Sequence, residues 1–185
     1  MYNSNPVTRI FFLLWVLIAL APAESSAQLL KASLEDLTKA STSIVHGETV
    51  QVRSFWTSDN RYIMTEATIQ VEETVRGMAS TSIVVTIPGG RVGNTEYEVS
   101  DMPVFSEGEE VVVFVSRHSS GSNMVVGGVQ GKLGVASSQE GGTRMVSGVG
   151  NWFESDNLTR PDEESDNVQS VALDELKRRI KETGQ

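Results

Sequence analysis

Apolar and polar positions alternate along two long stretches of the chain, and this alternation predicts strands. In Arg61–Val75 the odd-numbered positions are mostly apolar and the residues between them mostly polar. This is the pattern of a strand with one buried and one solvated face. In Ser43–Trp56 four apolar residues at even-numbered positions share a face, and the turn Thr57–Asn60 joins the two strands into a hairpin. The predicted buried faces are Ile44, Val50, Val52 and Trp56 in the first strand, and Ile63, Ala67, Ile69, Val71 and Val75 in the second.

Both predicted strands are far longer than the usual ~5–6 residues. Long strands with a single buried face must twist and coil to enclose a core. Gly47 lies inside the first strand, where a bulge or sharp bend would assist that coiling. The sequence therefore predicts a mainly β fold, a small OB-like closed or partly open antiparallel barrel. An open antiparallel β-sandwich is the alternative.

Shorter runs after the hairpin complete the predicted sheet. The five apolar residues Val111–Val115 are typical of a strand covered on both faces, either central or with a helix laid over the outside of a barrel. The other predicted strands are Thr81–Ile87, Glu96–Ser100, Glu109–Ser116, Asn123–Val129, Lys132–Val135 and an edge hairpin within Thr143–Phe153.

A helix is predicted at each end of the barrel domain. The first is Leu29–Thr42, with Ser33 as its N-cap and Asp36 at the capping-box position. The second is an amphipathic helix over Val168–Glu182, whose last turns are basic and so complement the helix dipole. The predicted apolar anchors are Leu30, Leu34 and Leu37 in the first helix, and Val171, Leu176 and Ile180 in the second.

The N-terminal segment reads as a secretory signal peptide. Ile10–Ala23 is an apolar run preceded by Arg9 and followed by small residues. The run is shorter than the ~20 residues that cross a bilayer as a helix, and cleavage is expected after Ala27, with a retained anchor as the alternative. We expect a signal peptide at 1–27, a barrel domain at 28–153, an acidic linker at 154–167 and a C-terminal helix at 168–185, in a chain that is secreted or periplasmic and not stably inserted in the membrane.

Charge and cysteine content exclude several functions. The formal net charge is −9, which argues against nucleic acid and anionic membrane surfaces, since both are bound through Lys and Arg. The chain has no Cys, which excludes disulfides, thiol catalysis and Cys-ligated zinc.

No motif for catalysis or cofactor binding is found. His46 and His118 fall on different elements without a flanking carboxylate pattern, so we expect ordinary surface or half-buried histidines and no metal site. No Gly-x-Ser-x-Gly elbow occurs. The glycine-rich Pro88–Gly93 follows a strand but lacks the Gly-Lys-Ser/Thr ending of a phosphate loop. We predict no catalytic residue and no cofactor, and a turn that forms a recognition loop from Pro88, Gly89, Gly90, Arg91 and Gly93.

Three aromatic residues offer a second candidate surface. Trp56, Trp152 and Tyr62 would line a carbohydrate or peptide groove, or alternatively close the ends of the core.

Several segments together resemble an uncharacterised family of exported bacterial proteins. They are Ser43–Gly47, TEATIQVEETVRG over Thr65–Gly77, VVTIPGGRVG over Val84–Gly93, FSEGEEVVVFV over Phe105–Val115 and VGGVQGKLGV over Val126–Val135. The resemblance covers about Leu34 to Val135 and implies no established activity.

The same order of segments is distantly similar to the netrin/TIMP-type module. Ile44–Val50, Arg76-Gly77 and Gly108-Glu109-Glu110 occupy the places of its characteristic motifs. The resemblance implies a five-stranded OB-like barrel with helices packed on it. Inhibitors of that type bind a protease zinc through an N-terminal Cys, so metalloprotease inhibition does not carry over to a chain without Cys.

The sequence favours a non-enzymatic exported module that binds a protein or an extracellular polymer. OB barrels bind through one strand face and the connecting loops. The alternatives are a secreted hydrolase with an unrecognised site, marked by two facing carboxylates, and a structural subunit that docks through its C-terminal helix.

Overall fold

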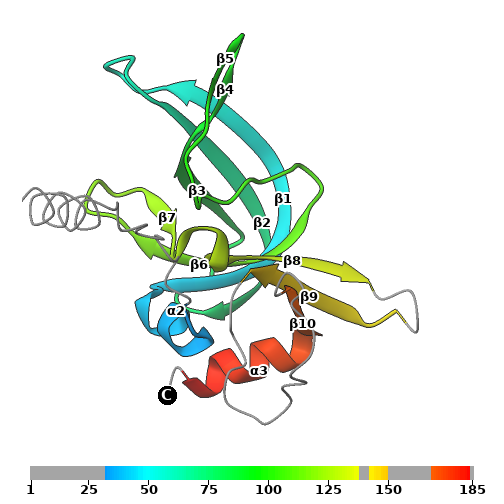
Figure 1. Ribbon diagram of the computed structural model, residues 1–185. Coiled ribbons are helices and arrows are strands. Elements are labelled where there is room, and N and C mark those ends of the chain that lie inside the picture. Colours follow the sequence, from blue (N-terminus) through cyan, green and yellow to red (C-terminus); the bar gives the residue numbers. More distant parts are fainter. Residues whose placement is uncertain (1–31, 138–141, 150–167, 184–185) are drawn as a thin grey trace, which may run out of the picture. The chain divides into compact units, whose positions relative to one another are not determined.

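Strands β1 (Ser43–Trp56) and β2 (Ile63–Arg76) form the long antiparallel hairpin that the alternation predicts. They are the longest strands of the computed structural model, which describes residues 32–137, 142–149 and 168–183 (Figure 1). The turn between them includes Asn60, which adopts a positive φ of 53°. The observed bounds of β1 are the predicted ones, and those of β2 differ by one or two residues from the predicted Arg61–Val75.

Five strands close into a barrel. The sheet order runs from β1 and β2 through β3 (Ser82–Pro88) and β7 (Asn123–Val125) to β6 (Glu110–Arg117), and β6 pairs again with β1. This closure excludes the open sandwich and confirms the barrel. One pairing differs from an all-antiparallel arrangement, because β3 and β7 run parallel at Val85 and Asn123.

The sheet continues outward from β6 through three more strands. A 3₁₀ turn, η1 (Gly128–Gly131), leads into β8 (Lys132–Ser137), which pairs with β6 and with β9 (Arg144–Val149). β9 pairs in turn with β10 (Val168–Ala172), so β9 is an inner strand and not part of the predicted edge hairpin. The predicted strand at Asn123–Val129 is likewise shorter, since only its first three residues form β7.

The C-terminal helix α3 (Leu173–Thr183) begins later than predicted. The five residues expected to form its first turns pair with β9 instead, from Val168 opposite Val149 to Ala172 opposite Met145. β-Branched residues are suited to strands, and an open strand was available for them to pair with. The prediction of a helix was therefore wrong for Val168–Ala172, which form β10, and right from Leu173 onward.

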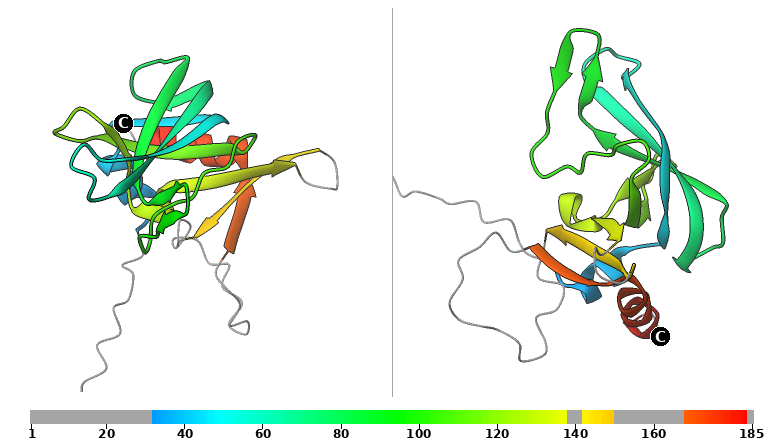
Figure 2. Two further views of the ribbon diagram at one scale, coloured as in Figure 1. Left: turned by 90° about the horizontal axis from the view of Figure 1, so that it is seen from above. Right: turned by 90° about the vertical axis from the view of Figure 1, so that its right-hand side faces the viewer.

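Helix α2 (Leu34–Ala40) is shorter than the predicted Leu29–Thr42, because Ser33 caps its start and the chain is already extended at Ser41. Its cap is the predicted one. The Ser33 hydroxyl accepts a hydrogen bond from the Asp36 backbone N–H, and the Asp36 carboxylate accepts one from the Ser33 backbone N–H. Leu34 and Leu37 are buried, while Leu30 lies outside the described residues. In Figures 1 and 2, α2 and α3 lie at the opposite end of this unit from the hairpin of β4 (Gly90–Val92) and β5 (Thr95–Tyr97). β5 replaces the predicted strand Glu96–Ser100.

Two hydrophobic clusters lie on the two faces of the sheet. Val111, Val113 and Val115 point into the barrel with residues of β1, β2 and β3, whereas Val112 and Phe114 pack toward the helices. This confirms the prediction that the apolar run of β6 is covered on both sides. The helix-side cluster is completed by α3, whose Leu173, Leu176 and Ile180 are buried there.

Three β-bulges change which residues share a face. The pairing of β1 with β2 shifts between Ile44 and Val45, between His46 and Gly47, and between Thr49 and Gln51. An extra residue reverses the inside–outside alternation beyond it. The prediction of one shared apolar face in β1 is therefore wrong: Ile44 is buried in the helix-side cluster, Val52 packs against the barrel cluster and Val50 is 47% exposed. Trp56 alternates in step with Val52 but is 38% exposed at the end of the strand. Val75 of β2 likewise leaves the barrel interior and joins the helix-side cluster.

Several predicted segments lie outside the described residues: the signal peptide at 1–27, the acidic linker at 154–167 and Trp152. Within the described ranges, no helix has the length and hydrophobicity needed to cross a bilayer.

Candidate functional site

The predicted recognition loop is mainly a strand connection. Pro88 ends β3 and Gly90 begins β4. The Gly89 N–H donates to the Ile63 carbonyl at 2.9 Å, and the Thr65 hydroxyl donates to the Gly89 carbonyl at 2.7 Å. These two bonds hold the start of the β4–β5 hairpin against β2.

Close packing explains why glycine occupies position 90. Gly90 has a φ of +127°, and a Cβ there would lie 2.2 Å from Thr65 Oγ1 and 2.4 Å from Ser54 Oγ. Only a residue without a side chain allows the hairpin to approach β1 and β2 so closely. Arg91, in contrast, is exposed and lies opposite Glu96. Of the predicted loop, Arg91 is the residue that presents a functional side chain to solvent.

Three aromatic side chains are exposed at the same end of the structure. They are Trp56 at the end of β1, Tyr62 just before β2 and Tyr97 at the end of β5. The ring centroids of Tyr62 and Tyr97 lie 6.1 Å apart and the rings are tilted by 43°. The tertiary structure thus brings aromatic residues of two separate hairpins into contact.

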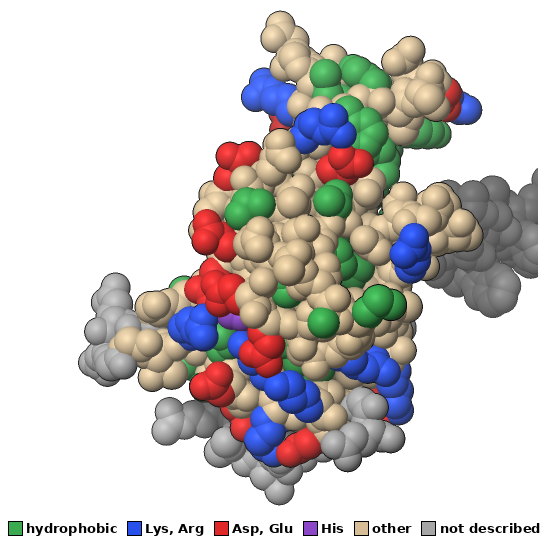
Figure 3. Space-filling view, turned by 180° about the vertical axis from the view of Figure 1, so that it is seen from behind, with side chains coloured by type: hydrophobic (Ala, Val, Ile, Leu, Met, Phe, Trp, Pro, Cys, Tyr) green, Lys and Arg blue, Asp and Glu red, His purple; other side chains and the backbone are tan. Residues whose placement is uncertain are grey.

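Arginines accompany these rings. The guanidinium of Arg61 lies 5.7 Å from the centroid of the Tyr62 ring, and that of Arg53 lies 5.3 Å from the Phe55 ring. Arg53 also forms an ion pair with Glu66 at 2.8 Å. In Figure 3 this end shows hydrophobic and Lys or Arg side chains close together. We call Trp56, Tyr62, Tyr97, Arg53 and Arg61 the aromatic end.

The composition of the aromatic end is that of a binding surface. Trp, Tyr and Arg are the residues enriched among those that carry most of the free energy of protein interfaces. Sequence reasoning had singled out Trp56 and Tyr62 but not Tyr97, which lies in a mostly polar segment. The exposure of Tyr97 results from the position of the β4–β5 hairpin.

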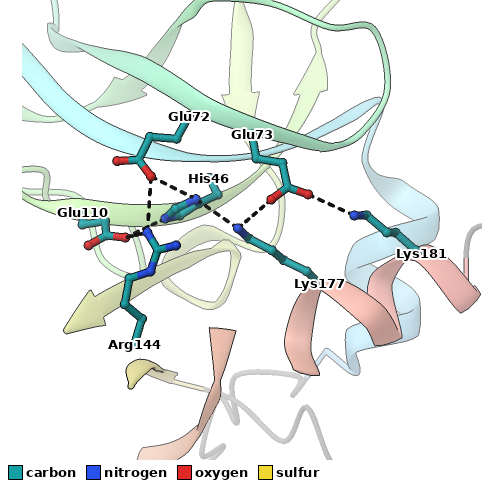
Figure 4. Close-up of polar contacts among 7 residues, drawn as sticks. All are labelled: His46, Glu72, Glu73, Glu110, Arg144, Lys177 and Lys181. Atoms are coloured by element: carbon teal, nitrogen blue, oxygen red, sulfur yellow. Dashed lines mark hydrogen bonds and ion pairs between the residues drawn. The ribbon is translucent and has the colours of Figure 1, made fainter. Parts of the chain in front are cut away.

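Apart from the aromatic end, a cluster of charged residues surrounds His46 near α3, and we call it the ionic cluster (Figure 4). His46 is 1% exposed, so the expectation of a surface or half-buried histidine was wrong. Its Nε2 lies 2.7 Å from Glu110 Oε1, and its Nδ1 lies 3.2 Å from Lys177 Nζ. An ammonium group can only donate, so Nδ1 accepts and Nε2 carries the proton that is donated to Glu110. Both ring nitrogens are therefore engaged.

Four further charged side chains complete this ionic cluster. Lys177 and Lys181 of α3 donate to the two carboxylate oxygens of Glu73 at 2.7 and 2.9 Å. These hydrogen bonds lower the pKa of Glu73 from 4.5 to about 2. Arg144 of β9 lies 3.3 Å from Glu72 and 3.0 Å from Glu110. The cluster thus joins β1, β2, β6, β9 and α3.

The bulge between His46 and Gly47 positions the two acids of β2. In a regular strand, Glu72 and Glu73 would point to opposite faces. The pairing skips Glu72, because His46 lies opposite Glu73 and Gly47 opposite Val71. Both neighbouring carboxylates consequently reach the same cluster, Glu72 toward Arg144 and Glu73 toward the lysines of α3. No pattern in the sequence indicates this bulge position beyond the presence of Gly47.

His46, Glu72 and Glu110 meet the spacing of a metal site, since one ligating atom of each lies within 4.8 Å of the others. The arrangement nevertheless favours an internal ion network. Arg144 lies between the two carboxylates, and Lys177 donates to His46 Nδ1. A metal on Nε2 would displace the proton to Nδ1, directly against the Lys177 ammonium group. The two acids also do not form a general acid–base pair, because both bind the same arginine.

Comparisons with protein-family models, with curated proteins and with solved structures each found no match to this chain.

Proposed function

We propose that this chain is an exported, non-enzymatic binding module on an OB-like barrel, and that its aromatic end binds a protein or an extracellular polymer. One observation carries this proposal. Trp56, Tyr62 and Tyr97 are exposed together although they come from two hairpins, and Tyr62 and Tyr97 are in ring contact. Exposing aromatic rings in a group is unfavourable in water unless a partner covers them.

The rest of the molecule supports binding rather than catalysis. The side chains most suited to acid–base chemistry are His46, Glu72 and Glu110. They are bonded to one another or to Lys177 of α3 and Arg144 of β9. The closed barrel with two helices is the fold that the resemblance to the netrin/TIMP-type module implies. The net charge of −9 argues for a partner other than nucleic acid.

A structural subunit that docks through its C-terminal helix is supported less well. The apolar residues of α3, Leu173, Leu176 and Ile180, are buried in the helix-side cluster of the same chain. The helix has therefore already used its apolar face, and its exposed face is charged.

The aromatic end is tested by removing its rings together. We expect the variant Trp56→Ala/Tyr62→Ala/Tyr97→Ala to lose at least about tenfold in affinity, because each buried aromatic contact contributes more than about 1 kcal/mol to an interface. The probes are soluble peptidoglycan fragments and a displayed library of random dodecapeptides, each measured against immobilised full chain. The matched control is Met78→Ala, which removes an 88% exposed apolar side chain just after β2. Equal binding by the two variants would contradict the proposal.

A further inference from the structure

Part of β1 is an open sheet edge beside the aromatic end. β1 pairs with β6 only along Ser43–Glu48. From Gln51 to Trp56 it pairs with β2 alone. At this end, the edge of β1 that faces away from β2 therefore has no neighbouring strand.

The ladder geometry shows which backbone groups face that side. The Thr57 N–H donates to the Tyr62 carbonyl at 2.9 Å. In an antiparallel pair the hydrogen-bonded and non-hydrogen-bonded positions alternate. Phe55 and Arg53 therefore bond toward β2, whereas the N–H and C=O groups of Trp56, Ser54 and Val52 point away from it. Ile63 of β2 lies opposite Trp56 and agrees with this alternation. Its carbonyl points away from β1 and accepts a hydrogen bond from the Gly89 N–H at 2.9 Å, on the side of β3.

The outward edge is closed at one end and open at the other. The Val52 N–H donates to the Glu107 carboxylate at 3.0 Å. Within the described residues, the backbone N–H and C=O groups of Ser54 and Trp56 have no hydrogen-bond partner. An unpaired row of this kind is a template for a further strand.

We propose that an extended polypeptide segment of a partner protein binds along Ser54–Trp56 as an added strand of the sheet. This inference rests on the proposed function and names its partner class. Alternating donors and acceptors at strand spacing match a peptide backbone, which presents the same alternation. A sugar polymer does not present N–H and C=O groups in this alternation at strand spacing.

Charge complementarity narrows the chemistry of this segment. The open edge runs into the hairpin turn, where the exposed guanidinium of Arg61 lies over the Tyr62 ring. The neighbouring Asp59 carboxylate accepts from the Arg61 backbone N–H at 3.3 Å, and none of the ion pairs among the described residues involves the Arg61 guanidinium. The bound segment therefore carries an Asp or Glu at the end near the turn, while its neighbouring residues pack against Trp56.

The first experiment selects ligands and then tests their backbones. Dodecapeptides are selected from the displayed random library on the full chain, and each selected peptide is resynthesised with single N-methyl groups along its length. We expect acidic peptides, and a loss of affinity of about threefold to tenfold at two positions that lie two residues apart, because Ser54 and Trp56 are the two residues with unpaired outward groups. Loss at consecutive positions, or at none, would overturn the inference.

The second experiment observes the edge directly. Amide hydrogen exchange, measured by NMR, should slow at Ser54 and Trp56 when a selected peptide is bound. Arg53 and Phe55, which already bond toward β2, serve as internal controls and should change little. Unchanged exchange at Ser54 and Trp56 in the saturated complex would contradict strand addition.

The third experiment removes one donor from the protein. Ser54→Pro deletes the outward N–H without breaking a bond to β2, and Pro is tolerated at such edge positions. Ser54→Ala is the matched control, since both variants lose the hydroxyl bond to Thr65. We expect Ser54→Pro to bind peptide about threefold to tenfold more weakly than Ser54→Ala. The exchange experiment remains decisive if Ser54→Pro fails to fold.

The outcomes separate this inference from the proposed function. One outcome is that the triple aromatic variant binds the ligands more weakly while neither N-methylation nor Ser54→Pro changes their affinity. In that case strand addition is wrong, but the aromatic end still binds. If the library yields no peptide while peptidoglycan fragments bind, the inference likewise fails alone. If the triple aromatic variant binds every probe like the wild-type chain, the proposed function fails.

Discussion

His46 Nδ1 and Lys177 Nζ lie 3.2 Å apart, although 131 positions separate the two residues in the sequence. His46 is in the first strand and Lys177 in the last helix. The same ammonium group also donates to Glu73. This contact therefore ties the C-terminal helix to the barrel through two buried or half-buried partners.

Removing the Lys177 ammonium should destabilise the fold. Lys177→Met keeps the alkyl chain but leaves His46 Nδ1 without its donor, and we expect a loss of about 1–3 kcal/mol in the free energy of unfolding. Lys181→Met is the control, because Lys181 also contacts Glu73 but its side chain is 55% exposed. Urea unfolding followed by circular dichroism measures both. A larger effect from Lys181→Met would contradict the assigned role of Lys177.

Stability should depend on pH through Glu73. Its pKa in the folded protein is about 2, below the ordinary 4.5, because Lys177 and Lys181 donate to it. The folded state thus binds this proton less tightly than the unfolded state, so the stabilisation is complete above pH 4.5 and is lost as the pH falls from 4.5 toward 2. Since the Glu73 side chain is 38% exposed, solvent screening reduces the effect to about 1–2 kcal/mol.

The comparison that isolates this carboxylate is wild type against Glu73→Gln, unfolded in urea between pH 2 and 7. The difference in unfolding free energy should be constant at neutral pH and shrink in the acid range. Glu98→Gln, at an exposed acid of the loop after β5, should show no such difference. A constant gap down to pH 2 would rule out the Glu73 linkage.

Gly47 should not accept a side chain. A Cβ at this position would lie 2.1 Å from the Gln70 carbonyl oxygen, which belongs to the partner strand and cannot move aside. We expect Gly47→Ala to cost more than about 3 kcal/mol or to prevent folding. Gly134→Ala in β8 is the matched control, because the nearest atom to its Cβ is 4.0 Å away. The free energy of unfolding of Gly134→Ala, measured by thermal denaturation, should stay within about 1 kcal/mol of the wild-type value.

Neighbouring positions of the predicted recognition loop should separate packing from binding. Gly90→Ala places a Cβ against Thr65 and Ser54, so it should lower the melting temperature and displace the β4–β5 hairpin. Arg91→Ala should leave the melting temperature unchanged but weaken binding of a selected acidic peptide by about threefold or more. If Arg91→Ala binds that peptide normally, the loop takes no part in recognition.

The periodicity of the sequence predicted the local structure well where one principle governed it. Ser33 and Asp36 form the capping box that their spacing indicates, and the apolar run of β6 is covered on both faces. The prediction failed at β10, because the residues before α3 pair with a strand that only the assembled sheet supplies. It failed again at Val50, since a bulge reverses the alternation from which its burial was inferred.

The candidate surfaces divide in the same way. Trp56, Tyr62 and Arg91 were identifiable from residue type and position, but the contact of Tyr62 with Tyr97 and the burial of His46 were not. The sequence by itself determined the hairpin, the helix cap, the barrel class and the absence of disulfides, because these follow from periodicity, capping chemistry and composition. Only the tertiary structure decided the bulges, the ionic cluster and the open edge of β1, because each depends on how distant strands pair and no local pattern encodes that register.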